Sequence, residues 1–327
     1  MKSSRMPAPE DWPVWTLIEV ERFESAQDER PFLEVAASLV TEFGELSMLL
    51  VQVRPPSAED RITARNEAIL CGLVVRIGKL TRRLVAETYE GRSELQLLLD
   101  REIFTSTVAM AYLLRGGTER FEAFVREGLR VEQSVWHHLD KNLKLRNGQA
   151  LPMEQRMRQR LELSFELAAL SPDDDVSFDG PSLTGQFNAI DESDTHRMPP
   201  PWPPLKDQLA AIGEPDAHRM HQLGADSIHG VWNELLTHHM RYVGDSHMLE
   251  PKLEWSSAQV QPLTAVAIQA SRVMAAYSRY LSHEVADAFR DKFLDLAGRA
   301  SVVDRLHEEY WARSPRLSRD GIVEEDW

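Results

Sequence analysis

Apolar residues recur at helical spacing along nearly the whole chain of 327 residues, and this pattern constrains the fold more than any other feature. Side chains three or four residues apart share one face of an α-helix, whereas a half-buried strand alternates apolar and polar residues. Residues 32–53 show the helical pattern, with Leu33, Ala36 and Val40 on one stripe. No run of alternating β-branched residues typical of a strand occurs. The sequence therefore predicts an all-α fold without a sheet.

Turn-forming residues divide this pattern into eight expected helices. The expected helices span residues 32–53, 57–91, 93–114, 118–145, 153–170, 215–242, 262–283 and 285–311. Pro55-Pro56 and Asn147-Gly148 mark two of the ends, because proline lacks an amide donor and glycine and asparagine adopt the left-handed conformation that closes helices. Long helices with short connections favour an elongated antiparallel bundle of about seven or eight helices.

The segment 171–204 interrupts the helical pattern with seven acidic residues, one arginine and a proline run around Trp202. Consecutive prolines favour extended polyproline conformations, so we expect a solvated loop, with a docking segment for an aromatic-lined groove as the alternative. The expected organisation is a loosely ordered extension at 1–30, a first helical layer at 31–170, this acidic, proline-rich loop, a second helical layer at 205–313 packed on the first, and a tail at 314–327.

The formal net charge of -15 opposes general nucleic-acid affinity, because phosphate repels an acidic chain unless its basic residues are segregated. They are segregated in part: residues 57–160 hold 18 Lys or Arg against 14 Asp or Glu. This region carries a net charge of +4, so the remaining chain carries -19. A protein partner, a second copy of the chain, RNA or a nucleotide all stay open as ligands.

Cysteine content and hydropathy indicate the compartment. The single cysteine, Cys71, cannot form an intramolecular disulfide, and residues 1–10 lack the pattern of a signal peptide. In the mid-chain region the longest run without a charge, residues 103–114, has 12 residues, fewer than the roughly 20 that cross a bilayer. We expect a cytoplasmic protein without a membrane span.

Strong catalytic and metal-binding motifs are absent from the sequence. It contains no G-x-S-x-G elbow, H-E-x-x-H pair, C-x-x-C pair or Glu-x-x-His pair. We therefore expect neither a cofactor nor a metal ion.

Six of the 11 histidines lie within residues 218–247. On a helix, His229 shares a mixed polar strip with Asp226 and Asn233, which are three and four residues away. Imidazole titrates near neutrality, so His229 is a candidate general acid or base. The alternative is that these histidines only form hydrogen bonds with neighbouring helices.

Arg241 and His247 are separated by five residues. This spacing resembles the R-x(4-6)-H signature of HEPN-type ribonucleases, which are all-helical. The resemblance implies that Arg241 holds the scissile phosphate and that His247 assists its transfer to the ribose 2′-hydroxyl. Arginine suits that role because its planar fork binds two phosphate oxygens.

Two further groups of basic residues are candidates for contact with phosphate. One side of the expected second helix carries Arg76, Lys79, Arg82 and Arg83. The turn after residue 140 is crowded by Lys141, Lys144, Arg146, Arg156, Arg158 and Arg160. The alternative for both groups is a helix face that is only solvated.

Several local motifs resemble one bacterial family. The motifs are RNEAIL at residues 65–70, LLDREIF at 98–104, AYLL at 111–114 and Ser227-Ile228-His229-Gly230. They resemble an all-helical family described only as a domain of unknown function, number five-six-seven-seven. The resemblance implies a helical fold, a bacterial cytoplasmic setting and a stress or phage-defence role, without an established reaction.

The family resemblance also implies that Arg101 and His229 are brought together by the helices. Thr105 stands where relatives have an acid four residues after the arginine, so an ion pair there is lost or reassigned to Glu67 or Asp100. Three functions follow as hypotheses. The first is a bacterial helical protein with a stress or phage-defence role, the second a HEPN-like metal-independent ribonuclease or nucleotide-acting enzyme, and the third a non-catalytic helical scaffold or regulatory interaction protein.

Overall fold

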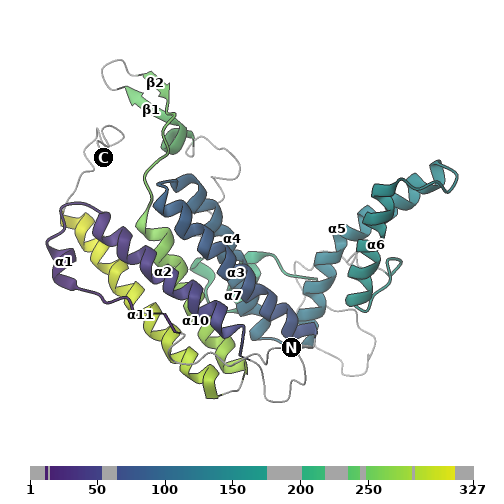
Figure 1. The fold of residues 1–327 in the computed structure, drawn as a ribbon, viewed down its shortest axis with the longest axis horizontal. Coiled ribbons are helices and arrows are strands. Elements are labelled where there is room, and N and C mark those ends of the chain that lie inside the picture. Colours follow the sequence, from purple (N-terminus) through teal and green to yellow (C-terminus); the bar gives the residue numbers. More distant parts are fainter. Residues whose placement is uncertain are drawn as a thin grey trace. The chain divides into compact units, whose positions relative to one another are not determined.

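The computed structural model describes residues 12–13, 15–53, 65–174, 201–217, 235–243, 248–281 and 284–313 (Figure 1). Its α-helices are α1 (Val20–Glu24), α2 (Arg30–Leu50), α3 (Arg65–Tyr89), α4 (Ser93–Leu114), α5 (Thr118–Leu145), α6 (Pro152–Leu167), α7 (Leu205–Ala211), α10 (Val260–Leu281) and α11 (Glu284–Arg313). Pro215–Ala217 form a 3₁₀ turn and Leu235–His239 a π-helical turn. The prediction of an all-α fold is confirmed.

Helix ends follow the turn chemistry that the sequence predicts. Asn147 and Gly148 have φ angles of 54° and 85°, and the Gly148 amide donates to the Leu143 carbonyl over 2.9 Å. This left-handed closure satisfies a carbonyl that would otherwise lack a partner at the end of α5. Gly91, with φ of 68°, ends α3 in the same conformation. The two intervening helices, α4 and α5, therefore have the predicted bounds.

The described residues form two compact units, one from Met1–Leu114 with Leu205–Trp327 and one from Arg115–Pro204. In the first unit, α2 packs against α3, α10 and α11, and α10 packs against α4 and α11 (Figure 1). The inward stripe of α2 supplies Phe32, Phe43 and Leu46, all without solvent exposure. The second unit has a core of its own between α5 and α6.

The N-terminal segment, expected to be a loosely ordered extension, contributes to the core of the first unit. Trp12 stacks on Phe289 of α11 with ring centroids 4.6 Å apart. Phe23 of α1 is fully buried and lies against Phe32 of α2. The side chain of Trp15 lies under the Arg299 guanidinium, 4.5 Å from its ring centroid. Aromatic burial therefore holds this segment, although its composition gives no helical periodicity.

A buried ion pair joins α2 and α11 in that core. The Arg299 guanidinium of α11 contacts both carboxylate oxygens of Glu42 in α2, with Nη1 2.9 Å from Oε2. Nη1 also donates to the Thr16 carbonyl, and the Thr16 amide donates back to Glu42 Oε2 over 3.0 Å. Burial lowers the pKa of Arg299, but hydrogen bonds and charge interactions with Glu42 and Asp295 together outweigh this effect and leave the pKa raised. Arg299 is therefore held in its charged form.

The expectation of a chain without a sheet is wrong for one short segment. Strand β1 (Met240–Val243) pairs antiparallel with β2 (Met248–Pro251), with Arg241 opposite Glu250 and Tyr242 opposite Leu249. The sequence pattern predicted helix as far as Tyr242. Four residues are too few to establish a period of two, and the partner strand lies several residues further along, so local periodicity does not detect the pairing.

Candidate functional site

The predicted catalytic histidines, His229 and His247, lie outside the described residues. Arg241, the proposed phosphate ligand, is on β1, where its Nε donates to Glu250 Oε1 over 2.8 Å. Because these residues are directly opposite in the strand register, the contact is a cross-strand ion pair of the kind that stabilises hairpins. Arg101 is partly buried in α4. Its proposed approach to His229 stays a prediction.

The basic side of α3 is neutralised in part. The Arg76 guanidinium donates to Ser106 Oγ over 3.0 Å and pairs with Glu102, both on α4. Arg83 pairs with the buried carboxylate of Glu87. Lys79 and Arg82 are exposed, and among the described residues neither makes an ion pair. Only Lys79 and Arg82 therefore remain of the four cations that the sequence places on this face of α3. Two cations form a weaker phosphate-binding surface than four.

A buried polar cluster lies where the segment after β2 meets α4. His238 Nδ1 is 3.1 Å from Ser256 Oγ and 3.8 Å from Glu94 Oε1. The Lys252 ammonium donates to the same hydroxyl over 3.1 Å, and the Ser256 amide donates to Glu94 Oε1 over 3.1 Å. The side chains of His238 and Ser256 are buried.

This cluster contains the residue types of a nucleophilic site but not its geometry. A serine–histidine–carboxylate relay places the serine and the acid on opposite ring nitrogens, whereas Ser256 and Glu94 both approach Nδ1 of His238. The backbone of Ser256 is also bonded in both directions, because its carbonyl accepts from the Ser93 amide over 3.2 Å. The arrangement fastens His238 and Ser256 to the start of α4.

Asp100 is half-buried in α4 and makes no hydrogen bond or ion pair with a described residue. Burial raises the pKa of this carboxyl group from 3.8 to about 7. Between pH 4 and 7 the carboxyl group of Asp100 is ionised in the unfolded chain but still protonated in the folded chain. The free energy of unfolding therefore falls as the pH rises through this range.

We expect Asp100→Asn to raise the free energy of unfolding by on the order of 2 kcal/mol at pH 8, with the gain shrinking towards zero near pH 4. Urea unfolding of both proteins at pH 8, 6 and 4 measures the difference. Asp291→Asn, at an exposed position of α11, is the control and should show little pH dependence. A gain for Asp100→Asn that is the same at all three pH values would contradict the shift.

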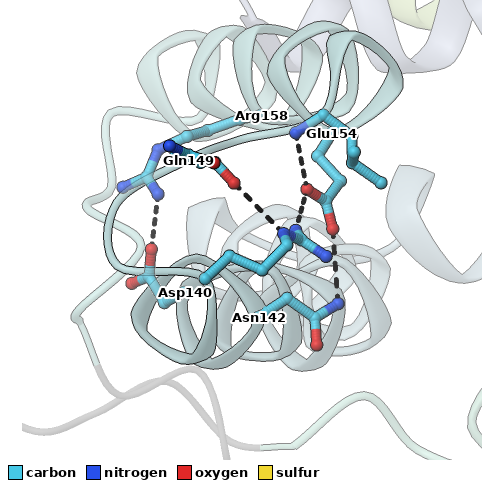
Figure 2. A network of polar contacts seen from close by, with 7 residues as sticks. Asp140, Asn142, Gln149, Glu154 and Arg158 are labelled. Atoms are coloured by element: carbon cyan, nitrogen blue, oxygen red, sulfur yellow. Dashed lines mark hydrogen bonds and ion pairs between the residues drawn. The ribbon is translucent and has the colours of Figure 1, made fainter.

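The turn between α5 and α6 is held by a network of polar contacts (Figure 2). Arg146 pairs with Glu154 and its Nε donates to the Gln149 carbonyl over 3.1 Å. Hydrogen bonds from Arg146 and from the Leu151 amide lower the pKa of Glu154. Asn142 Nδ2 lies 3.4 Å from the other oxygen of this carboxylate. The network fixes the turn, and because Glu154 is the counter-ion of Arg146, this arginine is not available to a ligand.

A second ion pair clamps the two helices further along the hairpin. The Arg158 guanidinium of α6 donates to Asp140 of α5 (Figure 2). It also lies 4.1 Å from the ring centroid of Trp136. Trp136 packs with Leu139 and Leu161 in the small core beneath. Arg158 is thus part of the packing between α5 and α6.

The other four basic residues of this turn remain available. Lys141, Lys144, Arg156 and Arg160 are exposed and form no ion pair with any described residue. Lys141 and Lys144 line an open hollow of about 530 Å³. Its other lining residues are His137, Asp140, Leu145 and Asp173. We call these four cations the basic tip of the α5–α6 hairpin.

Exposed apolar side chains accompany the basic tip. On α6, Met153 is 62% exposed, Leu163 52% and Leu167 70%. Leu145 at the end of α5 and Leu151 in the turn are also exposed. Large apolar side chains gathered beside charges that lack a counter-ion are typical of binding surfaces. Sequence reasoning located the basic residues of this turn but missed the apolar surface, because exposure depends on which face of α6 meets α5.

Comparison with known proteins gives no family: no family model, curated protein or solved structure matches the chain. Within the described part of the chain, no group of three His, Cys, Asp or Glu side chains is arranged to hold a metal ion. None of the described helices combines the length and the apolar character needed to cross a bilayer.

Proposed function

We propose that the protein is a non-catalytic helical interaction protein and that the α5–α6 hairpin is its partner-binding element. The observation that carries the proposal is the basic tip, where Lys141, Lys144, Arg156 and Arg160 are exposed without ion pairs beside exposed methionine and leucine side chains. Arginine and methionine are enriched at protein interfaces.

The construction of the hairpin supports a binding role. Its internal charges are paired, by Arg146 with Glu154 and by Arg158 with Asp140. These contacts hold the backbone of the turn in one conformation, so little conformational entropy is lost when a partner binds. The remaining cations face solvent, where they can attract an acidic partner before contact.

The polar residues elsewhere give less support to an enzyme. Arg241 is engaged by Glu250, and the His238 cluster bonds the chain to itself. The ribonuclease hypothesis stays a prediction, as does the stress or phage-defence role implied by the family resemblance. Growth arrest on expression, lost in His247→Ala or His229→Ala with the fold retained, would favour the enzyme instead.

Affinity capture from native cells tests the binding role of the hairpin. Lys141→Glu with Lys144→Glu reverses two charges of the basic tip, and we expect it to reduce recovery of a specific partner at least about tenfold, since repulsion replaces steering and contact. Lys79→Glu with Arg82→Glu, two exposed cations of α3, changes the net charge equally and is the matched control. Equal recovery by both variants, or loss only in the α3 variant, would refute the proposal.

A further inference from the structure

We propose that α6 receives an acidic amphipathic helix of the partner protein along a second apolar stripe. This inference rests on the proposed function and specifies the chemistry of the partner. The stripe consists of Met153, Arg156, Met157, Arg160, Leu163 and Leu167, each of which lies three or four residues from another member, so that they share one face of α6.

Helix α6 presents three faces, and only one of them is packed. The inner face carries Leu161 and Phe165, which are buried against α5 with Ala168. The polar face carries Gln155, Gln159, Glu162 and Glu166, all exposed. The second apolar stripe lies between them. A surface helix of a globular protein typically has one apolar face, which packs on the core. We therefore infer that the second apolar face of α6 packs against a helix of another protein.

The size of the stripe fits one helix. From Met153 to Leu167 it runs 14 residues along α6, which is about 21 Å at 1.5 Å per residue. Four apolar side chains lie along this length, Met153 and Met157 at one end and Leu163 and Leu167 at the other, and they offer apolar contacts to the apolar face of an amphipathic helix. Methionine adapts its shape to the side chains of a partner.

The charges of the stripe select an acidic occupant. Arg156 and Arg160 lie one turn apart within the stripe, and neither has a counter-ion among the described residues. Lys141 and Lys144 add positive charge at the same end of the hairpin. Glutamate or aspartate flanking the apolar face of the partner would form charge-assisted hydrogen bonds with these arginines.

Other occupants fit less well. Two copies of α6 packed antiparallel about the middle of the stripe would place Arg160 against Arg160 of the second copy, which is repulsive. Single-stranded nucleic acid stacks its bases on aromatic rings, and the stripe has none. Anionic membranes are bound by clusters of four or more basic residues. The stripe has two, and Lys141 and Lys144 bring the hairpin to four, so the test includes phosphatidylserine vesicles.

The probe is a fluorescent synthetic helix of about 18 residues, with leucine at positions i, i+4, i+7 and i+11 and glutamate beside them. Two control peptides replace either every glutamate by lysine or every leucine by serine. We expect the full chain to bind the glutamate peptide and neither control in fluorescence anisotropy. Arg156→Glu with Arg160→Glu should reverse the preference towards the lysine peptide.

Two matched pairs of variants separate the stripe from total charge. We expect Arg156→Gln with Arg160→Gln to weaken binding roughly three- to tenfold and Leu163→Ser with Leu167→Ser roughly thirtyfold or more. Gln155→Glu with Gln159→Glu changes the net charge as much as the arginine variant, but on the polar face of α6, and should have less than about a twofold effect. All six positions are exposed, so circular dichroism should show the wild-type fold.

Each remaining outcome overturns the inference. Tighter binding of an oligouridylate or of phosphatidylserine vesicles than of the peptide would indicate nucleic acid or a membrane. A dimer that Leu163→Ser with Leu167→Ser dissociates would indicate a second copy of the chain. Peptide binding only after deletion of residues 175–200 would indicate that this segment of the chain is the occupant. If partner capture depends on Lys141 and Lys144 but no peptide binds, the proposal of an acidic helical partner is wrong and the proposed function stands. If partner capture does not depend on these lysines and no peptide binds, both proposals are wrong.

Discussion

Replacement of Glu42 by alanine is expected to lower the free energy of unfolding by about 3–5 kcal/mol. The carboxylate is 2% exposed and is the main counter-ion of Arg299, whose own side chain is 13% exposed. Its removal leaves a buried cation with Asp295, the Thr16 carbonyl and the Trp15 ring as its described partners, and it also leaves the Thr16 amide without its acceptor. The N-terminal segment, α2 and α11 would all be loosened.

Urea unfolding measures this loss, and the chain offers a matched control. Glu34 is on the same helix and pairs with Arg22, but its side chain is 62% exposed, so Glu34→Ala should cost no more than about 1 kcal/mol. Glu42→Leu combined with Arg299→Leu should be less damaging than Glu42→Ala alone, because it removes the unpaired charge as well. A cost for Glu42→Ala as small as that for Glu34→Ala would show that solvent reaches Arg299.

The sequence pattern predicts helices well where neighbouring residues decide the structure. The bounds of α4 and α5 follow from Gly91 and Asn147-Gly148, whose left-handed φ angles need no distant contact. The pattern fails where distant residues decide. The β1–β2 hairpin and the stacking of Trp12 on Phe289 depend on partners that no local window contains.

The same limit applies to the candidate site. A basic cluster around the α5–α6 turn is visible in the sequence, but the cations that remain available are not. Arg158 is neutralised by Asp140, 18 residues away, and Arg146 by Glu154, eight residues away. The distinction between paired Arg158 and unpaired Arg156 and Arg160 therefore requires the register of the two helices. The Ser256–Glu94 contact spans 162 residues and has no sequence signal at all.

Phe165→Ala is expected to unfold the α5–α6 hairpin locally while the other unit stays folded. Phe165 is 1% exposed and fills the core that Leu129 and Ala168 share. Truncation of a buried phenylalanine costs about 3–5 kcal/mol, and two helices with so small a core have little stability in reserve. Hydrogen exchange should therefore accelerate throughout α5 and α6 but not in α2, whose core is separate.

Leu167→Ala is the control for Phe165→Ala, because Leu167 lies two residues away on the exposed stripe and its truncation should change stability by no more than about 0.5 kcal/mol. The two variants should both weaken binding of the acidic helix but for different reasons. Phe165→Ala removes the folded surface, so its affinity should recover with a stabilising cosolvent such as trimethylamine oxide. Leu167→Ala removes a contact, so its affinity should not recover.

Uniform exchange of α2, α5 and α6 in Phe165→Ala would show instead that the two units unfold as one, and the hairpin would then not be an independent binding element.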